Sequence, residues 1–246
     1  MGSLCADVAM TPSEVRSNWM DMVCIVIDVI CTSSTIVTLI EKGSPRVYPV
    51  RSITRARSLA GDRGYLIGGE RNGLALPGFD FDNSPFNIHK IDVQGKKTVM
   101  TTTNGTRAIN KVALSRNVLI GCFLNAEACC QSALDLAHKH STGIGIVCAG
   151  TKGKFALDDA LCAGYLIKTL LRIGNQDITV SDAAIAAKRL YEVYPNIEKG
   201  FMDSTSGKRL VEINHEQDLT CCSMVNIFHV VPILVKDTPC YFKRLE

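Results

Sequence analysis

The residues best suited to chemistry stand close together between Gly68 and Pro85, in the segment GGERNGLALPGFDFDNSP. Its polar side chains are mostly oxygen donors, the ligand type that suits a hard cation such as Mg²⁺. Neither a helical nor a two-residue apolar period survives there, so we expect a long ordered loop, and such loops in compact domains are often functional. The alternative is a solvated loop whose Asp and Asn side chains only cap turns. The polar residues are Glu70, Arg71, Asn72, Asp80, Asp82, Asn83 and Ser84.

A second candidate is the segment TTTNGTR, from Thr101 to Arg107. It follows a predicted strand and precedes a predicted helix, and helix N-termini with free N–H groups and hydroxyls bind anions, phosphate especially. Gly105 permits a close backbone approach, and Arg107 adds a charged fork. The alternative is an ordinary capped helix start.

Short apolar runs alternate with helical patterns along the chain, which indicates an α/β fold with a mainly parallel sheet covered by helices. We expect one domain over residues 1–246, within which residues 175–225 are mainly helical and could form a subdomain. The predicted strands are 22–28, 47–50, 65–67, 97–101, 118–121, 144–148 and 228–235. The predicted helices are 36–42, 52–60, one that ends near 114, 125–139, 157–172 and 182–194.

Several predicted strands end in a short stretch that carries hydroxyl or amide groups. Ligands of open α/β sheets bind outside the carboxyl ends of the strands. We therefore expect these polar residues to meet at one rim, with the segment 68–85 closing over it. They are Asp28, Ser33, Thr102, Asn104, Asn125 and Thr151.

Composition limits the function classes. The net charge of +3 is slight and no basic block interleaves with aromatic residues, which argues against nucleic-acid binding but allows a small anionic, phosphorylated substrate. The apolar runs are of strand length and no signal peptide precedes them, so we expect a cytoplasmic protein without a membrane segment. The sequence leaves the oligomeric state open, a homo-oligomer included.

The cysteine pattern favours buried, reduced thiols. The eleven cysteines are odd in number, contain no CxxC and mostly lie in apolar runs. The doublets Cys129-Cys130 and Cys221-Cys222 invite a zinc site, but neighbours on opposite faces of one element converge poorly.

Several phosphate-handling motifs are missing or incomplete. There is no GxxxxGK[ST] and no complete GxGxxG after a strand. Asp28 lacks the second Asp, two residues on, that phosphatases with a nucleophilic aspartate have by family resemblance; Ile30 is there. The segment from Cys148 to Lys154 is similar to a thiol-phosphatase loop, but Lys154 cannot offer the bidentate fork of an Arg. A thiolate mechanism stays an alternative, and it would survive a chelator, unlike metal catalysis.

Five motifs occur in order along the chain: IDVxxxxST, GGERNGLxxPGFDFxNSP, TTTNGTRA, LIGxFLNA and CAGTxGxFxLDDAxxAG. Together they resemble the 2-phosphosulfolactate phosphatase (ComB) family, and the closing DLTCCSMVNIFHVVP resembles the C-terminal segment of that family. The similarity extends from about Val23 to Pro232. It implies a Mg²⁺-dependent phosphatase of the coenzyme M pathway that converts phosphosulfolactate to sulfolactate and phosphate. It also implies a three-layer α/β/α fold of the family's own type, with a mainly parallel or mixed sheet.

The resemblance leads to a hypothesis for individual roles, although each residue could instead be a cap or a loop anchor. Glu70 and Asp28 would hold the metal, and the candidates for catalysis are Asp28, Asp80 and Asp159, of which Asp80 or Asp159 would orient or deprotonate the attacking water. The substrate would be bound by Arg71, Asn72, Asn104, Thr106, Arg107, Asn125, Thr151 and Lys152, among which Arg71 and Lys152 would meet the sulfonate or carboxylate. For Asp159 and its neighbour Asp158, capping of the following helix is the default.

The chain departs from the family pattern at one notable position. The family usually has DVLRATST where this chain has DVICTSST, so Cys31 replaces an Arg; Asn226 also stands where an Asp is frequent. Loss of that Arg would weaken substrate binding or change the substrate. The alternative function is therefore a non-catalytic anion-binding or regulatory protein on the same scaffold.

Overall fold

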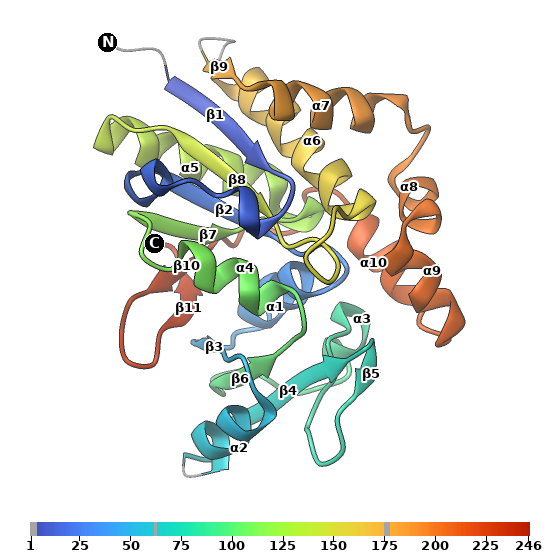
Figure 1. The fold of residues 1–246 in the computed structure, drawn as a ribbon. Coiled ribbons are helices and arrows are strands. Elements are labelled where there is room, and N and C mark those ends of the chain that lie inside the picture. The colour runs from blue at the N-terminus through green and yellow to red at the C-terminus, as the bar shows by residue number, and fades with distance from the viewer. Residues whose placement is uncertain (1–3, 62, 175–177) are drawn as a thin grey trace.

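The computed structural model describes residues 4–61, 63–174 and 178–246, and strands alternate with helices over most of this length (Figure 1). The strands are β1 (Leu4–Ala9), β2 (Val23–Ile27), β3 (Val47–Pro49), β4 (Leu66–Arg71), β5 (Leu74–Ala75), β6 (Thr98–Thr101), β7 (Asn117–Ile120), β8 (Ile144–Cys148), β9 (Ile178–Val180), β10 (Pro232–Val235) and β11 (Tyr241–Arg244). The α-helices are α1 (Thr32–Glu41), α2 (Ile53–Gly61), α3 (Pro85–Ile88), α4 (Gly105–Val112), α5 (Ala126–His140), α6 (Leu157–Ile173), α7 (Asp182–Val193), α8 (Ile197–Asp203), α9 (Thr205–Glu212) and α10 (Gln217–Ser223).

The strands form one mixed sheet in the order β5-β4-β6-β3-β11-β10-β7-β2-β8-β1-β9. It contains two parallel blocks, β7-β2-β8-β1-β9 and β3-β6-β4. Between them lies the antiparallel hairpin β10–β11, which pairs with β7 on one side and with β3 on the other. The predicted α/β class and layered sheet are confirmed.

The two parallel blocks have opposite strand directions, because three antiparallel pairings separate β7 from β3. In Figure 1, β1 runs down toward the middle of the molecule and β4 runs up toward α3. The carboxyl ends of both blocks therefore face the middle of the molecule. The hairpin pairs with each block through a single residue pair, Ile233 with Leu119 and Phe242 with Val47. Such short pairings allow a strong twist of the sheet between the two blocks.

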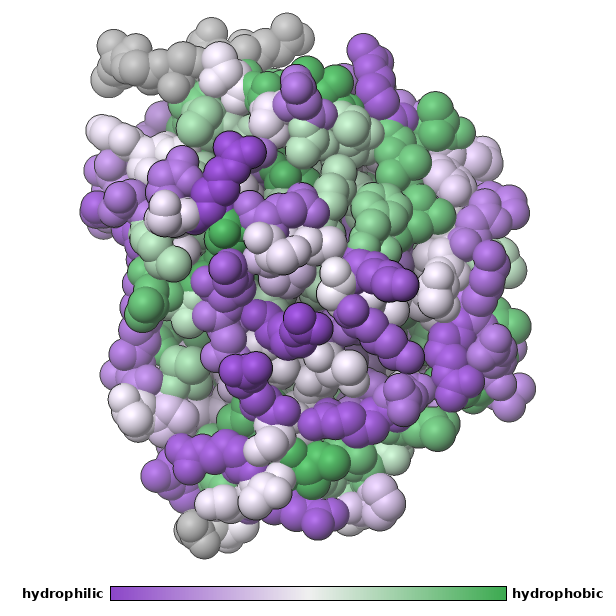
Figure 2. All heavy atoms as spheres, in the orientation of Figure 1, coloured by the Kyte–Doolittle hydropathy of each residue, from purple (hydrophilic) through white to green (hydrophobic). Residues whose placement is uncertain are grey.

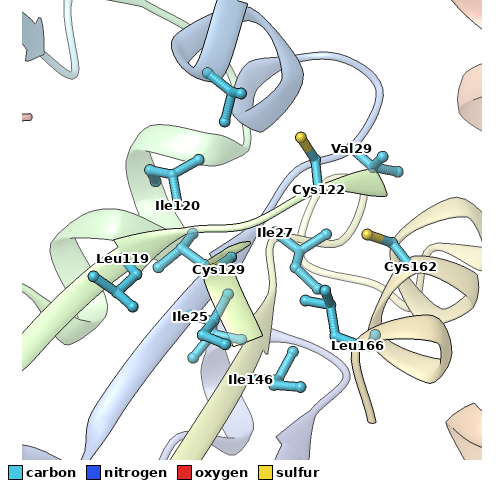
Figure 3. Close-up of a cluster of buried hydrophobic side chains, with 14 of the residues drawn as sticks. Ile25, Ile27, Val29, Leu119, Ile120, Cys122, Cys129, Ile146, Cys162 and Leu166 are labelled. Carbon is cyan, nitrogen blue, oxygen red and sulfur yellow. The ribbon is translucent and has the colours of Figure 1, made fainter. Parts of the chain in front are cut away.

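The core explains the layers. Every residue of β2 and β8 is buried, as expected for strands covered on both faces. Ile25 and Ile27 lie among the apolar side chains of α5 and α6, such as Cys129 and Leu166 (Figure 3). On the opposite face, the thiol of Cys24 lies 3.7 Å from the carbonyl oxygen of Trp19, and α4 packs against β2. Helices thus cover both faces of this block, as in a three-layer α/β/α fold.

The structure corrects several predicted elements. The segment 68–85 is not a loop throughout, because β4 extends to Arg71 and turns back into β5. The helix predicted at 36–42 begins four residues earlier, at Thr32, and the last predicted strand divides into an irregular stretch and β10. The strands β1, β5, β9 and β11 were not predicted.

The C-terminal part is mostly helical, as predicted, from α7 to α10. The predicted bounds of the subdomain, 175–225, begin outside the described residues, and its independence stays a prediction. Helices α8, α9 and α10 pack on one another and on α6 and α3. Among the described residues, no helix is both long and apolar enough for a membrane span. Figure 2 shows hydrophilic residues across the middle of the molecule and apolar ones mainly over α6 and α7.

Candidate active site

A cavity of about 400 Å³ lies where the ends of the two blocks meet α9 and α10. It has two sides of different origin. The strand-end wall comes from residues in or after β2, β4, β6 and β8: Asp28, Ile30, Cys31, Thr32, Glu70, Asn72, Gly73, Asp82, Asn83, Ser84, Thr103, Asn104, Thr151 and Lys152. The helical wall comes from α9, α10 and the turn between them: Thr205, Ser206, Lys208, Arg209, Leu210, Glu212, His215 and Asp218.

Asp28 is the deepest acid of the strand-end wall. It directly follows β2, is only 7% exposed, and its Oδ2 accepts a hydrogen bond of 2.5 Å from the Thr32 hydroxyl. A Cβ at Gly105 would lie 2.6 Å from the same oxygen, so only glycine lets α4 begin this close to the acid. Burial raises the pKa of Asp28 to about 7, helped by the charges of Asp158 and Glu70 and opposed by Thr32 and the Gly105 amide.

Glu70, in β4, lines the cavity and links β4 to Thr103, which follows the neighbouring strand β6. Its Oε1 accepts hydrogen bonds from the Thr103 amide (2.9 Å) and the Thr103 hydroxyl (3.0 Å). Its Oε2 accepts one from the Gly73 amide at 2.7 Å. The carboxylate is 9% exposed, so these contacts hold it nearly buried at the cavity surface.

Two tight turns of the same kind flank the cavity. Asn72 and Gly73 connect β4 to β5 with φ of 55° and 80°, the pattern of a type I′ hairpin turn. Lys152 and Gly153 have φ of 53° and 80° and are enclosed by an antiparallel bridge between the residues on either side of them. Asn104 joins the second turn to the start of α4, since its Oδ1 accepts a 3.1 Å hydrogen bond from the Lys152 amide. The predicted residues Asn72, Asn104, Thr151 and Lys152 thus line one cavity with Asp28 and Glu70.

Asp158 and Asp159 lie beneath the strand-end wall at the start of α6. Asp159 accepts hydrogen bonds of 2.9 Å from the amides of Val29 and Gly150, so it fixes the loops after β2 and β8 and does not line the cavity. Burial raises the pKa of Asp158 to about 6 and raises that of Asp159 strongly, with the charges of Asp158 and Asp28 adding to the second effect. Oδ1 of Asp158 is buried without a hydrogen-bond partner. Asp159 is thus more than a cap of the helix, because it holds two loops that lead to the cavity.

Seven other predicted residues lie outside the cavity: Ser33, Arg71, Asp80, Thr102, Thr106, Arg107 and Asn125. Asp80 accepts the Ile67 amide at 2.8 Å, and Arg71 donates to the Glu70 carbonyl and the Thr101 hydroxyl. Thr106 donates to the Thr102 carbonyl inside α4, while Arg107 is exposed.

Asn125 is the clearest departure from the predicted rim. It is fully buried, and both ends of its amide bind backbone: Oδ1 accepts the Cys122 amide, and Nδ2 donates to the carbonyls of Ile120 and Val230. It anchors the chain that leads to β10 and does not face a ligand.

The helical wall was not predicted as part of the site. The sequence of α9, TSGKRLVE, is that of an ordinary amphipathic surface helix, and nothing local to it indicates what it faces. Within the segment 68–85, Asp82 lines the cavity together with Glu70, whereas the predicted Asp80 does not. The neighbouring Asn83, whose Nδ2 lies 3.5 Å from the Thr32 hydroxyl, has a buried Oδ1 without a hydrogen-bond partner.

The thiol alternative has no support in the geometry. Cys148 is fully buried in β8, does not line the cavity, and burial raises its pKa well above the ordinary value, so its thiolate is disfavoured. Both doublets, Cys129-Cys130 and Cys221-Cys222, are buried free thiols. Cys31 does line the cavity; contact with Cys222 and burial raise its pKa, so it presents a neutral thiol.

Comparison with known proteins gives one consistent match. A family model described as 2-phosphosulpholactate phosphatase matches residues 9–237. A protein of Clostridium novyi named probable 2-phosphosulfolactate phosphatase is 37% identical over 210 residues, which cover 85% of this chain and 87% of the relative. Proteins of the same name from Pseudothermotoga lettingae and Thermotoga petrophila are 36% and 38% identical, with coverage of 94% and 86% of this chain and 96% and 88% of the relatives.

Proposed function

This chain belongs to the 2-phosphosulpholactate phosphatase family, a family of phosphoric monoester hydrolases, and we propose that it hydrolyses 2-phospho-3-sulfolactate to 3-sulfolactate and phosphate with the help of Mg²⁺. A related phosphorylated 2-hydroxy acid is the alternative substrate. One observation carries the proposal: the cavity brings two nearly buried carboxylates, Asp28 and Glu70, together with three cations, Lys152, Lys208 and Arg209. Such an arrangement suits a metal ion and a substrate with several negative charges.

The acids of the strand-end wall fit a divalent cation. Asp28 and Glu70 form no salt bridge with a Lys, Arg or His among the described residues, although both are nearly buried. An uncompensated buried carboxylate is costly unless it is protonated or paired with a cation. The unpartnered amide oxygen of Asn83 adds a third oxygen donor of the kind Mg²⁺ accepts.

No group of three or more His, Cys, Asp or Glu in the described part of the chain forms a metal cluster. Mg²⁺ does not need one, because it is typically held by one or two carboxylates with waters and substrate phosphate. We therefore assign Asp28 and Glu70 to the metal. When bound, Mg²⁺ supplies charge neutralisation at the phosphoryl oxygens and lowers the pKa of a coordinated water.

The cations of the cavity suit the remaining negative groups of the substrate. Lys152 lies on the strand-end wall, in the turn after β8, and Lys208 and Arg209 lie on α9, so positive charge reaches the cavity from both walls. Phosphosulfolactate carries a sulfonate and a carboxylate besides the phosphate. We assign these two groups to the three cations, and the phosphate to the side-chain amides of Asn72 and Asn104, which line the cavity.

Neither of the two acids put forward for the attacking water, Asp80 and Asp159, lines the cavity. The proposal therefore moves the orientation of this water to Asp28, which does line it. Asp159 would act through position, since its two backbone hydrogen bonds fix the loops that carry Val29 and Gly150. The protein mainly positions groups and stabilises charge in such a reaction, because phosphoryl transfer requires little covalent chemistry from the enzyme.

The alternative of a non-catalytic anion-binding protein rests on Cys31. This neutral side chain lines the cavity where the family pattern has an Arg, so the site lacks one charge that related chains would bring. In that case the cavity would bind phosphosulfolactate without releasing phosphate.

One assay separates the two functions. Purified protein is given phosphosulfolactate or 4-nitrophenyl phosphate with Mg²⁺, with a chelator, and after Cys31→Arg, and released phosphate is measured. We expect release from phosphosulfolactate only with Mg²⁺. Binding of phosphosulfolactate by calorimetry with no release under any condition would support the non-catalytic function, and restored release in Cys31→Arg would place the defect at that residue.

A further inference from the structure

His215 and Asp218 form a pair on the helical wall that the proposed function has not used. Nδ1 of His215 lies 3.5 Å from Oδ2 of Asp218. Asp218 is 2% exposed, and its other oxygen accepts hydrogen bonds from the Ser84 hydroxyl (2.7 Å) and the Phe86 amide (3.1 Å). The aspartate is therefore fixed by the segment that follows β4, and it fixes the imidazole in turn.

The pair has the geometry of an oriented proton donor. Because Nδ1 of His215 faces Asp218, Nε2 is the nitrogen left for the cavity. The backbone of His215 is also held, since its amide donates to the Leu210 carbonyl at 2.9 Å. The distance of 3.5 Å is long for a hydrogen bond, but such contacts frequently tighten when substrate binds. Of the five histidines in the chain, His215 is the one that lines the cavity.

The reaction needs a proton donor at the side of the leaving group. The leaving group of a 2-phospho hydroxy acid is a secondary alkoxide, which departs slowly unless its oxygen is protonated. Arg209 cannot give up a proton and Lys208 does so reluctantly, whereas an imidazole exchanges protons near neutral pH. Asp28 and Glu70 are assigned to the opposite wall and to the metal.

We propose that His215 is the general acid that protonates the leaving-group oxygen and that Asp218 is the residue that positions it. The inference rests on the proposed phosphatase function. The oxygen of water forms a bond to phosphorus while the bond from phosphorus to the ester oxygen breaks, and its electron pair stays on the ester oxygen. The proton of Nε2 passes to that oxygen and gives the alcohol. The water loses a proton to the medium, and the imidazole regains one from it.

Charged groups around the pair set its pH response. Arg209 and Glu212 on α9, Lys208 on the same helix and Asp82 after β4 all line the cavity with His215. Burial raises the pKa of Asp218, while the bonds from Ser84 and Phe86 and the charge of His215 oppose this and Asp82 adds to it.

The test compares two leaving groups in His215→Asn, with His229→Asn as the control, because His229 is exposed and does not line the cavity. Loss of a general acid costs about 10²–10⁴-fold in kcat on phosphosulfolactate. On 4-nitrophenyl phosphate, whose leaving group needs no proton, we expect a loss of less than about tenfold. His229→Asn should change neither rate, and circular dichroism and thermal melting should show all variants folded.

The pH profile provides the second readout. In the wild type, kcat on phosphosulfolactate should fall at alkaline pH as the acid loses its proton, and this limb should be missing in His215→Asn. In Asp218→Asn the limb should move to lower pH. Equal losses on both substrates, or an unchanged alkaline limb in His215→Asn, would overturn the inference while phosphatase activity of the wild type stands. A wild type that releases phosphate from neither substrate would overturn the proposed function itself, and this inference with it.

Discussion

The two walls of the cavity are held in different ways. On the strand-end wall the polar groups are nearly buried and bonded to backbone, as Glu70 is to Thr103 and Gly73. On the helical wall the charged groups are mostly solvent-facing and paired with other side chains, as Arg209 is with Glu212 at 3.0 Å. The first arrangement fixes position in a region of low dielectric, and the second supplies charge that solvent screens. The comparison teaches that metal-dependent chemistry should depend on the carboxylates of the first wall, whereas the exposed cations of the second wall should affect mainly substrate affinity.

The largest difference in effect between the two walls is expected for Glu70→Gln compared with Glu212→Gln. Each change removes one carboxylate from one wall. We expect Glu70→Gln to lower Mg²⁺-dependent phosphate release more than about 100-fold. Loss of a residue that only supports a metal ligand costs up to about 100-fold, and Glu70 is proposed as a direct ligand. Glu212→Gln should stay within a few-fold of the wild type, because its partner Arg209 remains. Steady-state kinetics with thermal melting checks both, and equal effects at the two positions would show that the walls do not divide the work.

The pH dependence of the unfolding free energy is the second test of the buried acids in and below the strand-end wall. The folded-state pKa values of Asp28 and Asp158, about 7 and about 6, lie above the ordinary 3.8. Between about pH 4 and 7 the folded protein thus holds protons that the unfolded chain has released, so this contribution to the unfolding free energy falls as pH rises.

For metal-free protein we expect the stability to decrease from pH 5 to pH 8 by a few kcal/mol at most from these groups. Mg²⁺ should restore the melting temperature at pH 8 and have little effect at pH 5. In Asp28→Asn both effects should shrink. Thermal melts at the two pH values, with and without Mg²⁺, test this; a variant with the pH dependence of the wild type would contradict it.

Arg209→Gln tests the helical wall directly. Its Nε donates to the Asn72 carbonyl at 3.2 Å, so the residue also holds the β4–β5 turn. We expect KM for phosphosulfolactate to rise about tenfold, equal to about 1.4 kcal/mol, with kcat within a few-fold. Arg189→Gln is the matched control, since Arg189 makes a similar exposed pair with Glu192 on α7, away from the cavity. A fall in kcat larger than the rise in KM would move Arg209 from binding to chemistry.

The smallest effect is expected for Asp80→Asn. Asp80 lies outside the cavity and its carboxylate accepts only the Ile67 amide among the described groups. Weakening this hydrogen bond should cost about 1 kcal/mol of unfolding free energy and leave the rate unchanged. Urea unfolding and phosphate release measure the two quantities, and a rate loss comparable to that of Glu70→Gln would return Asp80 to the site.

The strand-end wall could be predicted in part. Asn104 follows β6, in the block of opposite direction, and reaches the cavity because the hairpin β10–β11 makes the carboxyl ends of the two blocks face each other. Within one block, parallel strands bring their carboxyl ends together, so Asp28 and Thr151 needed only a correct strand assignment. That logic fails for Asn125, which also follows a strand but binds the backbone of Val230, a contact made only when β10 enters the sheet. It also cannot choose between Asp80 and Asp82, because the direction of each side chain depends on how the chain crosses β4.

The helical wall could not be predicted for another reason. The position of α9 depends on long-range packing against α6 as well as on its neighbour α8, and its own pattern is that of any surface helix. Strands β9 and β11 are three and four residues long, too short for a periodic signal. Of the strands that were not predicted, only β1, with the sequence LCADVA, has a usable pattern, an apolar run with one acid.

The hairpin of β10 and β11 sits at the centre of the sheet but comes after every other strand in the sequence. A chain emerging from the ribosome can therefore form each parallel block early but cannot join them until residues 232–244 have been made. Until then β7 and β3 would each present an open edge to other nascent chains. The catalytic cavity, which needs both blocks, is accordingly among the last parts of the molecule to mature.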